Sequence, residues 1–296
     1  MRTTLTRRRL LGLSTAAALT LPILPARAIA SRPASVVVWS DDSPDFGGFS
    51  GIELMPDRLT FYALSDRGHL VEGRLSRDTE GHLSGVTRGQ GYALRGSDGG
   101  GLGPRNSDAE GLSLDQNGAL VVAFEGGRRS RIARYATPGG RAQDIPGDPA
   151  WRALPGNQGL ECLAIDAGGR LYTIPETPDA RGFPLYRQAG DGWTVIASLP
   201  AEGNFAPVGA DFGPDGNLYL LERKFRLAFF GTRISRLRPG AWDRREVLVE
   251  TSYGLLDNHE GISVTADRNG RLWATTISDD NQNRFQRTEI AEFPLG

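Results

Sequence analysis

The feature that most constrains the fold is a unit that recurs along the chain. Its five copies start at residues 50, 110, 161, 208 and 260, so neighbouring copies lie 47 to 60 residues apart. Each copy has a strand, a turn, a mostly apolar second strand and an acidic residue at or near its end. The copies are SGIELMPDRLTFYALSDRG (50–68), EGLSLDQNGALVVAFEGG (110–127), ECLAIDAGGRLYTIPET (161–177), VGADFGPDGNLYLLERK (208–224) and EGISVTADRNGRLWATTISDD (260–280). Repeats of this length built from short strands are typical of β-propellers.

The turns inside the units support an all-β chain. Four of the five contain a glycine, in the sequences QNG, AGG, PDG and RNG. Asn-Gly and Asp-Gly pairs favour hairpin turns, because glycine adopts positive φ angles without steric cost. Further short alternating runs follow each hairpin, and no segment after the first thirty residues has helical periodicity.

The number of strands predicts how the ring closes. Only TEIAEFPL follows the last hairpin, so the fifth unit is one strand short, and ASVVVWS (34–40) can supply the missing strand. Pairing the two ends of the chain in one blade would leave no free sheet edge there. We therefore expect five blades. Six is the alternative if residues 141–156 hide further strands, and a β-sandwich is disfavoured because sandwiches have no reason to repeat in this way.

The first twenty-eight residues differ from the rest of the chain. TRRRLLG opens an uncharged apolar run, and Ala26-Arg27-Ala28 provides a small-residue cleavage site. This pattern is typical of a secretory signal, and the adjacent arginines resemble the twin-arginine export type. We predict a signal peptide over 1–28, one propeller domain over 29–296, and a periplasmic or secreted protein. The single cysteine, Cys162, excludes an intramolecular disulfide.

Charge and hydropathy limit the partners. The signal segment carries five arginines and no acid, so its removal takes the formal net charge from −1 to −6. An acidic protein of this kind is not expected to bind nucleic acid. The apolar run is too short to span a bilayer comfortably, so no membrane partner is expected after cleavage. We expect a monomer that acts on a small, anionic ester.

Acidic residues recur at two places in the units. Glu110, Glu161 and Glu260 stand just before the first strand, and a second acidic group ends the second strand. Since paired strands run in opposite directions, both sets should meet at one mouth of the propeller. Clustered oxygen ligands suit Ca²⁺ or Mg²⁺. The predicted metal ligands are Glu110, Glu161, Glu260, Asp280, Asp66 and Glu222, with Asn106, Asn157, Asn258, Asn281 and Asn283 nearby. The alternative is that these acids pair with arginines and join the blades.

The same mouth supplies candidate catalytic groups. Glu260 and Glu110 are expected to act with the metal, and His259 is a candidate general acid or base. The glycine after each of these glutamates would let the backbone approach closely. The candidate substrate-binding cations are Arg67, Arg223, Lys224 and Arg284. The chain has no G-x-S-x-G, H-E-x-x-H or phosphate-binding P-loop motif, which argues against a serine-triad hydrolase.

Seven segments together resemble the phytase-like family named for an esterase-like activity. They are GGFSGIEL, YALSDRG, DAEGLSLD, NQGLECLAI, LYLLERK, LDNHEGISV and SDDNQN, in the order of the family and over nearly the whole chain after the signal. The sequence departs from the family at Cys162, where glycine or alanine is usual. It departs again at 206–213, where an acidic residue usually stands earlier than Asp211. These departures leave open what the fourth unit contributes.

The resemblance implies a propeller and hydrolysis of phosphate or carboxylate esters. Together with the acidic mouth, it favours an exported ester hydrolase that requires a divalent cation. Two alternatives remain open. One is a calcium-dependent lactonase-type propeller, and the other is a binding propeller without catalysis whose acids are structural.

Overall fold

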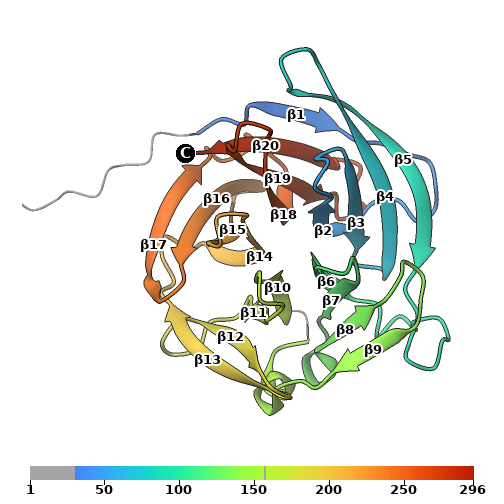
Figure 1. Ribbon diagram of the computed structural model, residues 1–296, viewed down its shortest axis with the longest axis vertical. Helices are drawn as coiled ribbons and strands as arrows, with labels where there is room; N and C mark the ends of the chain where they lie inside the picture. The colour runs from blue at the N-terminus through green and yellow to red at the C-terminus, as the bar shows by residue number, and fades with distance from the viewer. Residues whose placement is uncertain (1–30, 157) are drawn as a thin grey trace, which may run out of the picture.

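Five four-stranded antiparallel sheets stand around a central axis and form a five-bladed β-propeller (Figure 1). The structure is a computed structural model that describes residues 31–156 and 158–296. The predicted signal peptide, residues 1–28, and Asn157 lie outside this description. The prediction of an all-β, five-bladed propeller is confirmed.

Each blade takes four strands, numbered outward from the channel. The first blade comprises β2 (Phe49–Leu54), β3 (Thr60–Ser65), β4 (His69–Arg77) and β5 (Leu83–Ala93). The second comprises β6 (Ala109–Leu114), β7 (Leu120–Phe124), β8 (Arg131–Tyr135) and β9 (Ala142–Ile145). The third comprises β10 (Leu160–Ile165), β11 (Leu171–Pro175), β12 (Phe183–Ala189) and β13 (Gly192–Leu199). The fourth comprises β14 (Ala206–Phe212), β15 (Leu218–Arg226), β16 (Phe229–Arg238) and β17 (Ala241–Glu250).

The fifth blade closes the ring with both ends of the chain. It comprises β18 (Asn258–Ala266), β19 (Leu272–Asp279), β20 (Glu289–Leu295) and β1 (Ser35–Val38). Strand β1 lies beside β20 in antiparallel register, from the pair Ser35 and Glu292 to the pair Val38 and Glu289 (Figure 1). The predicted closure is therefore confirmed, and hydrogen bonds tie the two ends of the propeller together.

Residues 141–156, which could have held the strands of a sixth blade, contain no additional blade. Residues 141–156 supply the outer strand β9 and a short 3₁₀ helix, η2 (Pro149–Ala153), and a second 3₁₀ helix, η1, spans Gly127–Arg129. In η2, Trp151 is buried against Tyr186 of the third blade. No helix in the two described ranges is long and apolar enough to cross a membrane.

The hydrophobic core is divided among the blade interfaces. Within the described residues the buried apolar side chains form five clusters, and each cluster joins two neighbouring blades. One example is the cluster in which Tyr219 and Leu221 of β15 pack with Ile262 and Val264 of β18. Because each sheet buries both faces against neighbours, the second strands are mostly apolar, and blade positions around the channel are fixed.

Candidate functional site

The same β-bulge occurs near the start of the inner strand of every blade. The pairing register shifts between residues 49 and 51, 109 and 111, 160 and 162, 207 and 209, and 259 and 261. The extra residues are Ser50, Glu110, Glu161, Val208 and Glu260. A bulged residue is released from the regular alternation of the strand, so its side chain can be re-aimed. This device turns three glutamates towards one narrow channel, which is lined by Ser50, Glu110, Glu161 and Glu260.

Glycine follows the bulge in four blades because the inner strands meet there. A Cβ on Gly261 would lie 2.7 Å from the backbone nitrogen of Ile52 and 2.8 Å from Cα of Gly51. A Cβ on Gly111 would lie 2.8 Å from Cβ of Leu163. The predicted close approach of backbones is therefore present. In the third blade Cys162 occupies this position and is buried in the cluster shared with the fourth blade.

The bulge also fixes which residue of the second strand reaches the mouth. We call this residue of the second strand the mouth position. The last inner-strand residue before the bulge pairs with a residue of the second strand, and the mouth position is the residue that follows that partner. From the strand registers, the five mouth positions are Asp66, Glu125, Glu176, Arg223 and Asp279. The first, second, third and fifth blades thus present a carboxylate, and the fourth blade presents a guanidinium. The mouth therefore carries its own counter-charge.

Arg223 binds the acids of two other blades. Its Nη2 donates to Oε1 of Glu176 at 2.9 Å, and its Nη1 donates to Oδ1 of Asn258 at 2.8 Å and also contacts Glu260. Asn258 in turn donates from Nδ2 to Oε1 of Glu260 at 2.8 Å. Burial lowers the pKa of Arg223, but the charges of Glu260 and Glu176 more than offset it and raise that pKa. The predicted alternative, acids paired with arginine, describes this side of the mouth.

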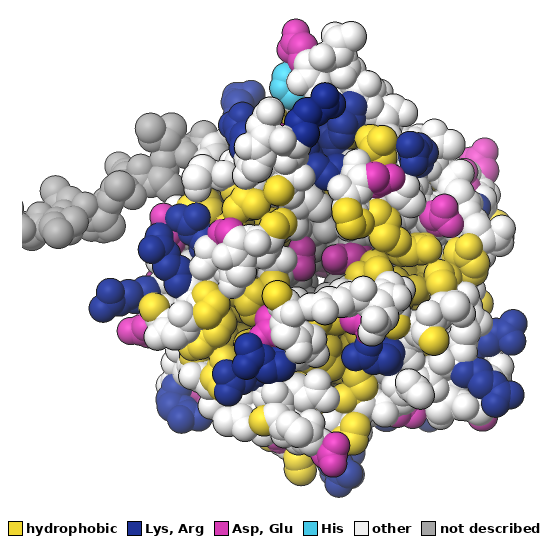
Figure 2. Space-filling model, in the orientation of Figure 1, with side chains coloured by type: hydrophobic (Ala, Val, Ile, Leu, Met, Phe, Trp, Pro, Cys, Tyr) yellow, Lys and Arg dark blue, Asp and Glu magenta, His cyan; other side chains and the backbone are white. Residues whose placement is uncertain are grey.

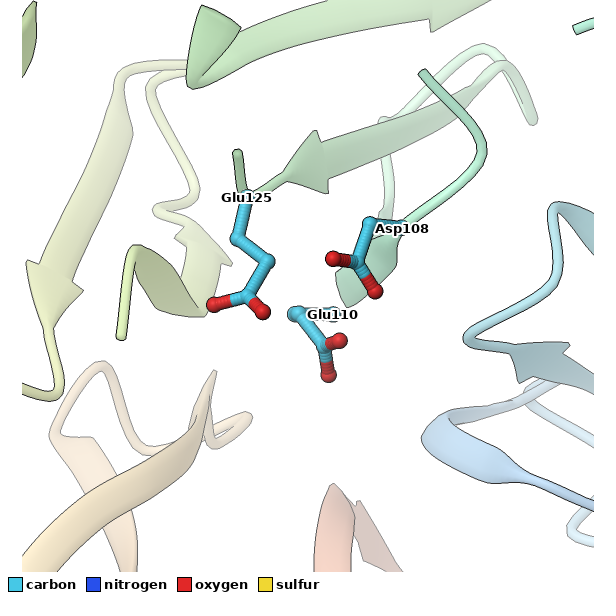
Figure 3. Close-up of side chains that lie close together, drawn as sticks. All are labelled: Asp108, Glu110 and Glu125. Carbon is cyan, nitrogen blue, oxygen red and sulfur yellow. The ribbon is translucent and has the colours of Figure 1, made fainter. Parts of the chain in front are cut away.

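A second group of acids has no such arginine partner among the described residues. One carboxylate oxygen from each of Asp108, Glu110 and Glu125 lies within 4.8 Å of the other two, and the three side chains are close together (Figure 3). Glu125 accepts a hydrogen bond from the backbone nitrogen of Gly159 at 2.9 Å. Three converging carboxylates are ligands of the kind that Ca²⁺ and Mg²⁺ prefer. These residues could therefore hold a divalent cation.

The pKa values reflect this concentration of negative charge. Burial raises the pKa of Glu110 well above its usual value, and Glu161, Glu260 and Glu125 raise it further. Burial and the neighbouring Asp108 together raise the pKa of Glu125 to about 7, against the lowering effect of the Gly159 hydrogen bond. A cation at the centre of the group would favour the charged forms and reverse these shifts.

The pKa values of the other two channel glutamates, Glu161 and Glu260, are raised by burial and lowered by Arg223. Burial raises the pKa of Glu161 well above its usual value, and Glu176 and Glu260 add to this, while Arg223 lowers it. Burial also raises the pKa of Glu260, against the lowering effects of Arg223 and Asn258. Both side chains are therefore candidates to hold or exchange a proton within the channel.

Asp66 and Asp280 lie at the mouth beside the first blade. Burial raises the pKa of Asp66, Arg67 lowers it, and Asp108 and Asp280 raise it. Asp280 is committed to its loop, because its carboxylate accepts from the backbone nitrogen of Gly48 at 3.0 Å and from Oγ1 of Thr288 at 3.1 Å. Asp280 follows β19 of the fifth blade, where the mouth position belongs to its neighbour, Asp279.

Two other predicted residues do not line the channel. Glu222 is fully buried, and its carboxylate accepts from Nη1 of Arg245 at 2.8 Å and from the hydroxyl of Ser235. His259 is 1% exposed, and its Nε2 lies 3.8 Å from Oε2 of Glu289 on β20. Neighbouring side chains of a strand point to opposite faces. Glu222 therefore points away from Arg223, and His259 points away from Glu260, and it is Arg223 and Glu260 that reach the mouth.

Of the four predicted substrate-binding cations, Arg223 alone is bound among the channel acids. Arg67 donates to the backbone oxygen of Phe46 at 2.7 Å and holds the loop before β2. Lys224 lies 3.3 Å from Glu250 and 4.2 Å from the ring centre of Phe205. The fourth cation, Arg284, is exposed on the loop after β19 and lies over the ring of Phe285.

Asp108, Glu125 and Glu176 were not among the predicted metal ligands. A sequence signal for Asp108 exists: DAEG (108–111) and NHEG (258–261) both place a polar side chain two residues before the bulged glutamate. The structure uses both, with Asp108 beside Glu110 and Asn258 beside Glu260. Glu125 and Glu176 directly follow the second strands β7 and β11 of their blades.

The channel is too narrow to admit a substrate. Its volume is about 10 Å³, roughly the space for one water molecule. Figure 2 shows Asp and Glu side chains at the central opening of the face in view, with hydrophobic side chains around them. Any ligand larger than an ion or a water must therefore bind at a mouth of the propeller.

The fold and site define a five-bladed propeller with an acidic, arginine-bridged mouth. The chain belongs to the phytase-like family described by the esterase-like activity of phytase, whose sequence model matches residues 44–282. No curated protein matches the sequence.

Solved structures with a similar fold are distant in sequence. A Bifidobacterium bifidum protein named as a candidate exo-beta-1,3-galactanase has a TM-score of 0.50 at 17% identity, covering 89% of this chain and 93% of its own. A gluconolactonase from Xanthomonas campestris has a TM-score of 0.46 at 17% identity, covering 84% and 89%. A streptogramin B lyase has a TM-score of 0.43 at 14% identity, covering 88% and 87%. At 17% identity the likeness to the first of these structures shows the fold alone.

Proposed function

We propose that this protein is a hydrolase of phosphate or carboxylate esters that uses a divalent cation at the mouth of the propeller. Membership of the phytase-like family supports the hydrolytic class. The observation that carries the proposal is the convergence of Asp108, Glu110 and Glu125 within 4.8 Å, with no cation among the described residues bonded to them. Ca²⁺ is the preferred ion, and Mg²⁺ the alternative, because all three ligands are hard oxygens.

The chain's own residues define the other parts of the reaction. A cation held by the three carboxylates would polarise an ester oxygen and lower the pKa of a bound water. Glu260 is fixed by Arg223 and Asn258, and its raised pKa moves proton exchange towards neutral pH. We assign it the role of proton acceptor from the attacking water. The water oxygen then bonds to the carbonyl carbon or phosphorus, the ester bond breaks, and the proton passes to the leaving alcohol.

Hydrolysis assays test this proposal directly. The mature protein should release p-nitrophenol from p-nitrophenyl acetate or p-nitrophenyl phosphate with Ca²⁺ or Mg²⁺, and EDTA should abolish the reaction. Glu110→Gln should lose most activity, whereas Asp144→Asn, a half-exposed carboxylate of the same blade, should not. Opening of a lactone with neither ester cleaved would favour the lactonase alternative. Tight Ca²⁺ binding without turnover of any of these substrates would contradict the enzymatic proposal.

We also propose that the protein is exported and acts as a monomer in the periplasm or medium. The basis is the arginine run at 7–9, the apolar run after it and the Ala-Arg-Ala site at 26–28. In a bacterium with a twin-arginine translocase, replacing Arg7, Arg8 and Arg9 by lysine should retain the precursor in the cytoplasm. Mass spectrometry of the exported wild type should place the new N-terminus near Ile29, and sedimentation velocity should give one monomeric species.

A further inference from the structure

The fourth blade carries a hairpin that extends past the acidic mouth. Beyond Arg223, strands β15 and β16 continue to pair through residues 224 with 231, 225 with 230, and 226 with 229. In the other four blades the second strand ends at the mouth position or one residue before it. Three further residues at about 3.3 Å each raise the hairpin about 10 Å above the mouth.

Aromatic side chains on this hairpin face a groove of about 650 Å³. Phe225 and Phe229 line it from the hairpin and Phe285 lines it from the loop between β19 and β20, with exposures of 64%, 57% and 80%. The rings of Phe225 and Phe230 lie 5.1 Å apart and form part of one wall. Large apolar side chains exposed together are uncommon on soluble proteins and mark a binding surface.

Backbone strain is concentrated beside the same groove. The described residues include six non-glycine residues with positive φ, and four of them flank it. Leu227 and Ala228 form the hairpin turn with φ of 50° and 67°, where Asn-Gly is usual, and Asn281 and Gln282 have φ of 47° and 49°. Such conformations cost stability and persist where a function requires the geometry. Two strained turns therefore present the aromatic walls.

The groove begins where the candidate site ends. Phe225 follows Arg223 by two residues, so both side chains project from the same face of β15. On the opposite side, Asp257 lines the groove, and the next residue, Asn258, accepts a hydrogen bond from Arg223. A ligand with one end at the arginine-bridged acids could therefore lay its other end between the aromatic side chains.

We propose that this groove binds the alkyl chain of the acyl group of the ester substrate, while the ester group lies at the acidic mouth. The inference rests on the proposed function and narrows its substrate class. Of the described residues that line the groove, Arg287 is the one cation, and its Nη2 already lies 2.6 Å from Oε1 of Glu289. This lining favours an apolar tail over a ligand with many phosphate groups.

The test varies the length of the apolar tail. We expect kcat/KM of the Ca²⁺-loaded wild type to rise about threefold per methylene from p-nitrophenyl acetate through butyrate to hexanoate. Phe225→Ser/Phe285→Ser should lower the hexanoate value about tenfold and leave the acetate value nearly unchanged. Leu227→Ser is the matched control, because Leu227 is 80% exposed on the same hairpin but does not line the groove. It should keep the wild-type dependence on chain length.

A binding measurement separates this inference from the proposed function. Calorimetry with octylphosphonate should show weaker binding to Phe225→Ser/Phe285→Ser than to wild type or Leu227→Ser. If no ester is hydrolysed but this pattern holds, the groove is supported and the proposed function is contradicted. Equal losses for acetate and hexanoate, or octylphosphonate binding that the double variant does not change, would overturn the inference. So would a wild-type dimer that the double variant converts to monomer, because the groove would then be an interface between copies.

Discussion

Arg223 of the fourth blade lies 2.9 Å from Glu176 of the third blade and contacts Glu260 of the fifth. One guanidinium thus joins three blades across the mouth and neutralises part of its acidic charge. The same contacts orient Glu260, to which we assign proton transfer. Arg223 therefore joins the ring and, in the proposed reaction, also positions the proton acceptor.

Replacing Arg223 by methionine should destabilise the protein most at neutral and alkaline pH. The change leaves Glu176 and Glu260 without their cation, and breaking a largely buried ion pair costs about 3 kcal/mol. At acid pH the Glu260 carboxyl, whose pKa is raised, can take up a proton, so the loss of unfolding free energy should be smaller. Urea unfolding at about pH 5 and about pH 8 measures the difference. The control Arg238→Gln, whose guanidinium is 65% exposed and pairs with Glu246, should cost less than about 1 kcal/mol.

Divalent cations should bind more tightly as pH rises through about 7. The pKa of Glu125 is raised to about 7, so below that pH a cation must displace its proton. Calorimetric titration with Ca²⁺ in two buffers of different ionisation enthalpy should show proton release near pH 6 that fades near pH 8. Glu125→Gln should reduce this proton release and lose much of the affinity, and Glu110, whose pKa is also raised, should account for the release that remains. Affinity that is independent of pH in the wild type would contradict the assignment of Glu125 as a ligand.

Without a cation, the same residue should make the protein less stable in alkali. The folded-state pKa of Glu125 lies above its unfolded value of 4.5, so its contribution is full below that value and is lost as pH rises through about 7. The melting temperature in EDTA should therefore fall across this range. Saturating Ca²⁺ should restore the melting temperature, because binding adds about 2.7 kcal/mol to the free energy of unfolding when the ion is at a hundred times its Kd. Asp144→Asn should behave as the wild type does.

A buried acid pair at the other end of the channel predicts a second pH effect. Burial raises the pKa of Asp211 to about 7, and burial and the charge of Asp211 raise the pKa of Glu53 well above its usual value. Because the folded-state pKa is raised, stability is lost as pH rises through about 7. Asp211→Asn keeps an oxygen to accept from the backbone nitrogen of Val264. It should gain about 1–3 kcal/mol over wild type near pH 8 and little near pH 5, measured by urea unfolding in EDTA. A gain that is equal at the two pH values would show that the acid pair is not its cause.

Gly261 should tolerate no side chain. A Cβ there would lie 2.7 Å from the backbone nitrogen of Ile52, which cannot move without shifting the inner strand of the first blade. Gly261→Ala should therefore cost about 1–3 kcal/mol in thermal unfolding. Gly85→Ala is the matched control in a strand, because its nearest neighbour is Cβ of Ser76 at 3.9 Å. A loss of stability equal to that of the control would show that the inner strands can separate.

The number of blades and the closure of the ring followed from the sequence because both are properties of local patterns. Turn glycines and apolar second strands recur within each unit, and a missing fifth-blade strand had one candidate at the other end of the chain. Local hydrogen bonding and strand period determine such features wherever the unit stands in the fold. The acidic character of the mouth was predictable for the same reason.

The division of that mouth into an arginine-bound side and a side whose acids could hold a cation was decided by tertiary structure. In sequence, Glu222 and Arg223 are neighbours, and either could reach the channel. The register of β15 with β14 brings Arg223 to the mouth and turns Glu222 towards Arg245. A strand places successive side chains on opposite faces, so one residue of register decides which of them meets the other blades. The sequence by itself determined that acids and glycines recur, and only the packing of five blades decided which acids face each other without a counter-charge.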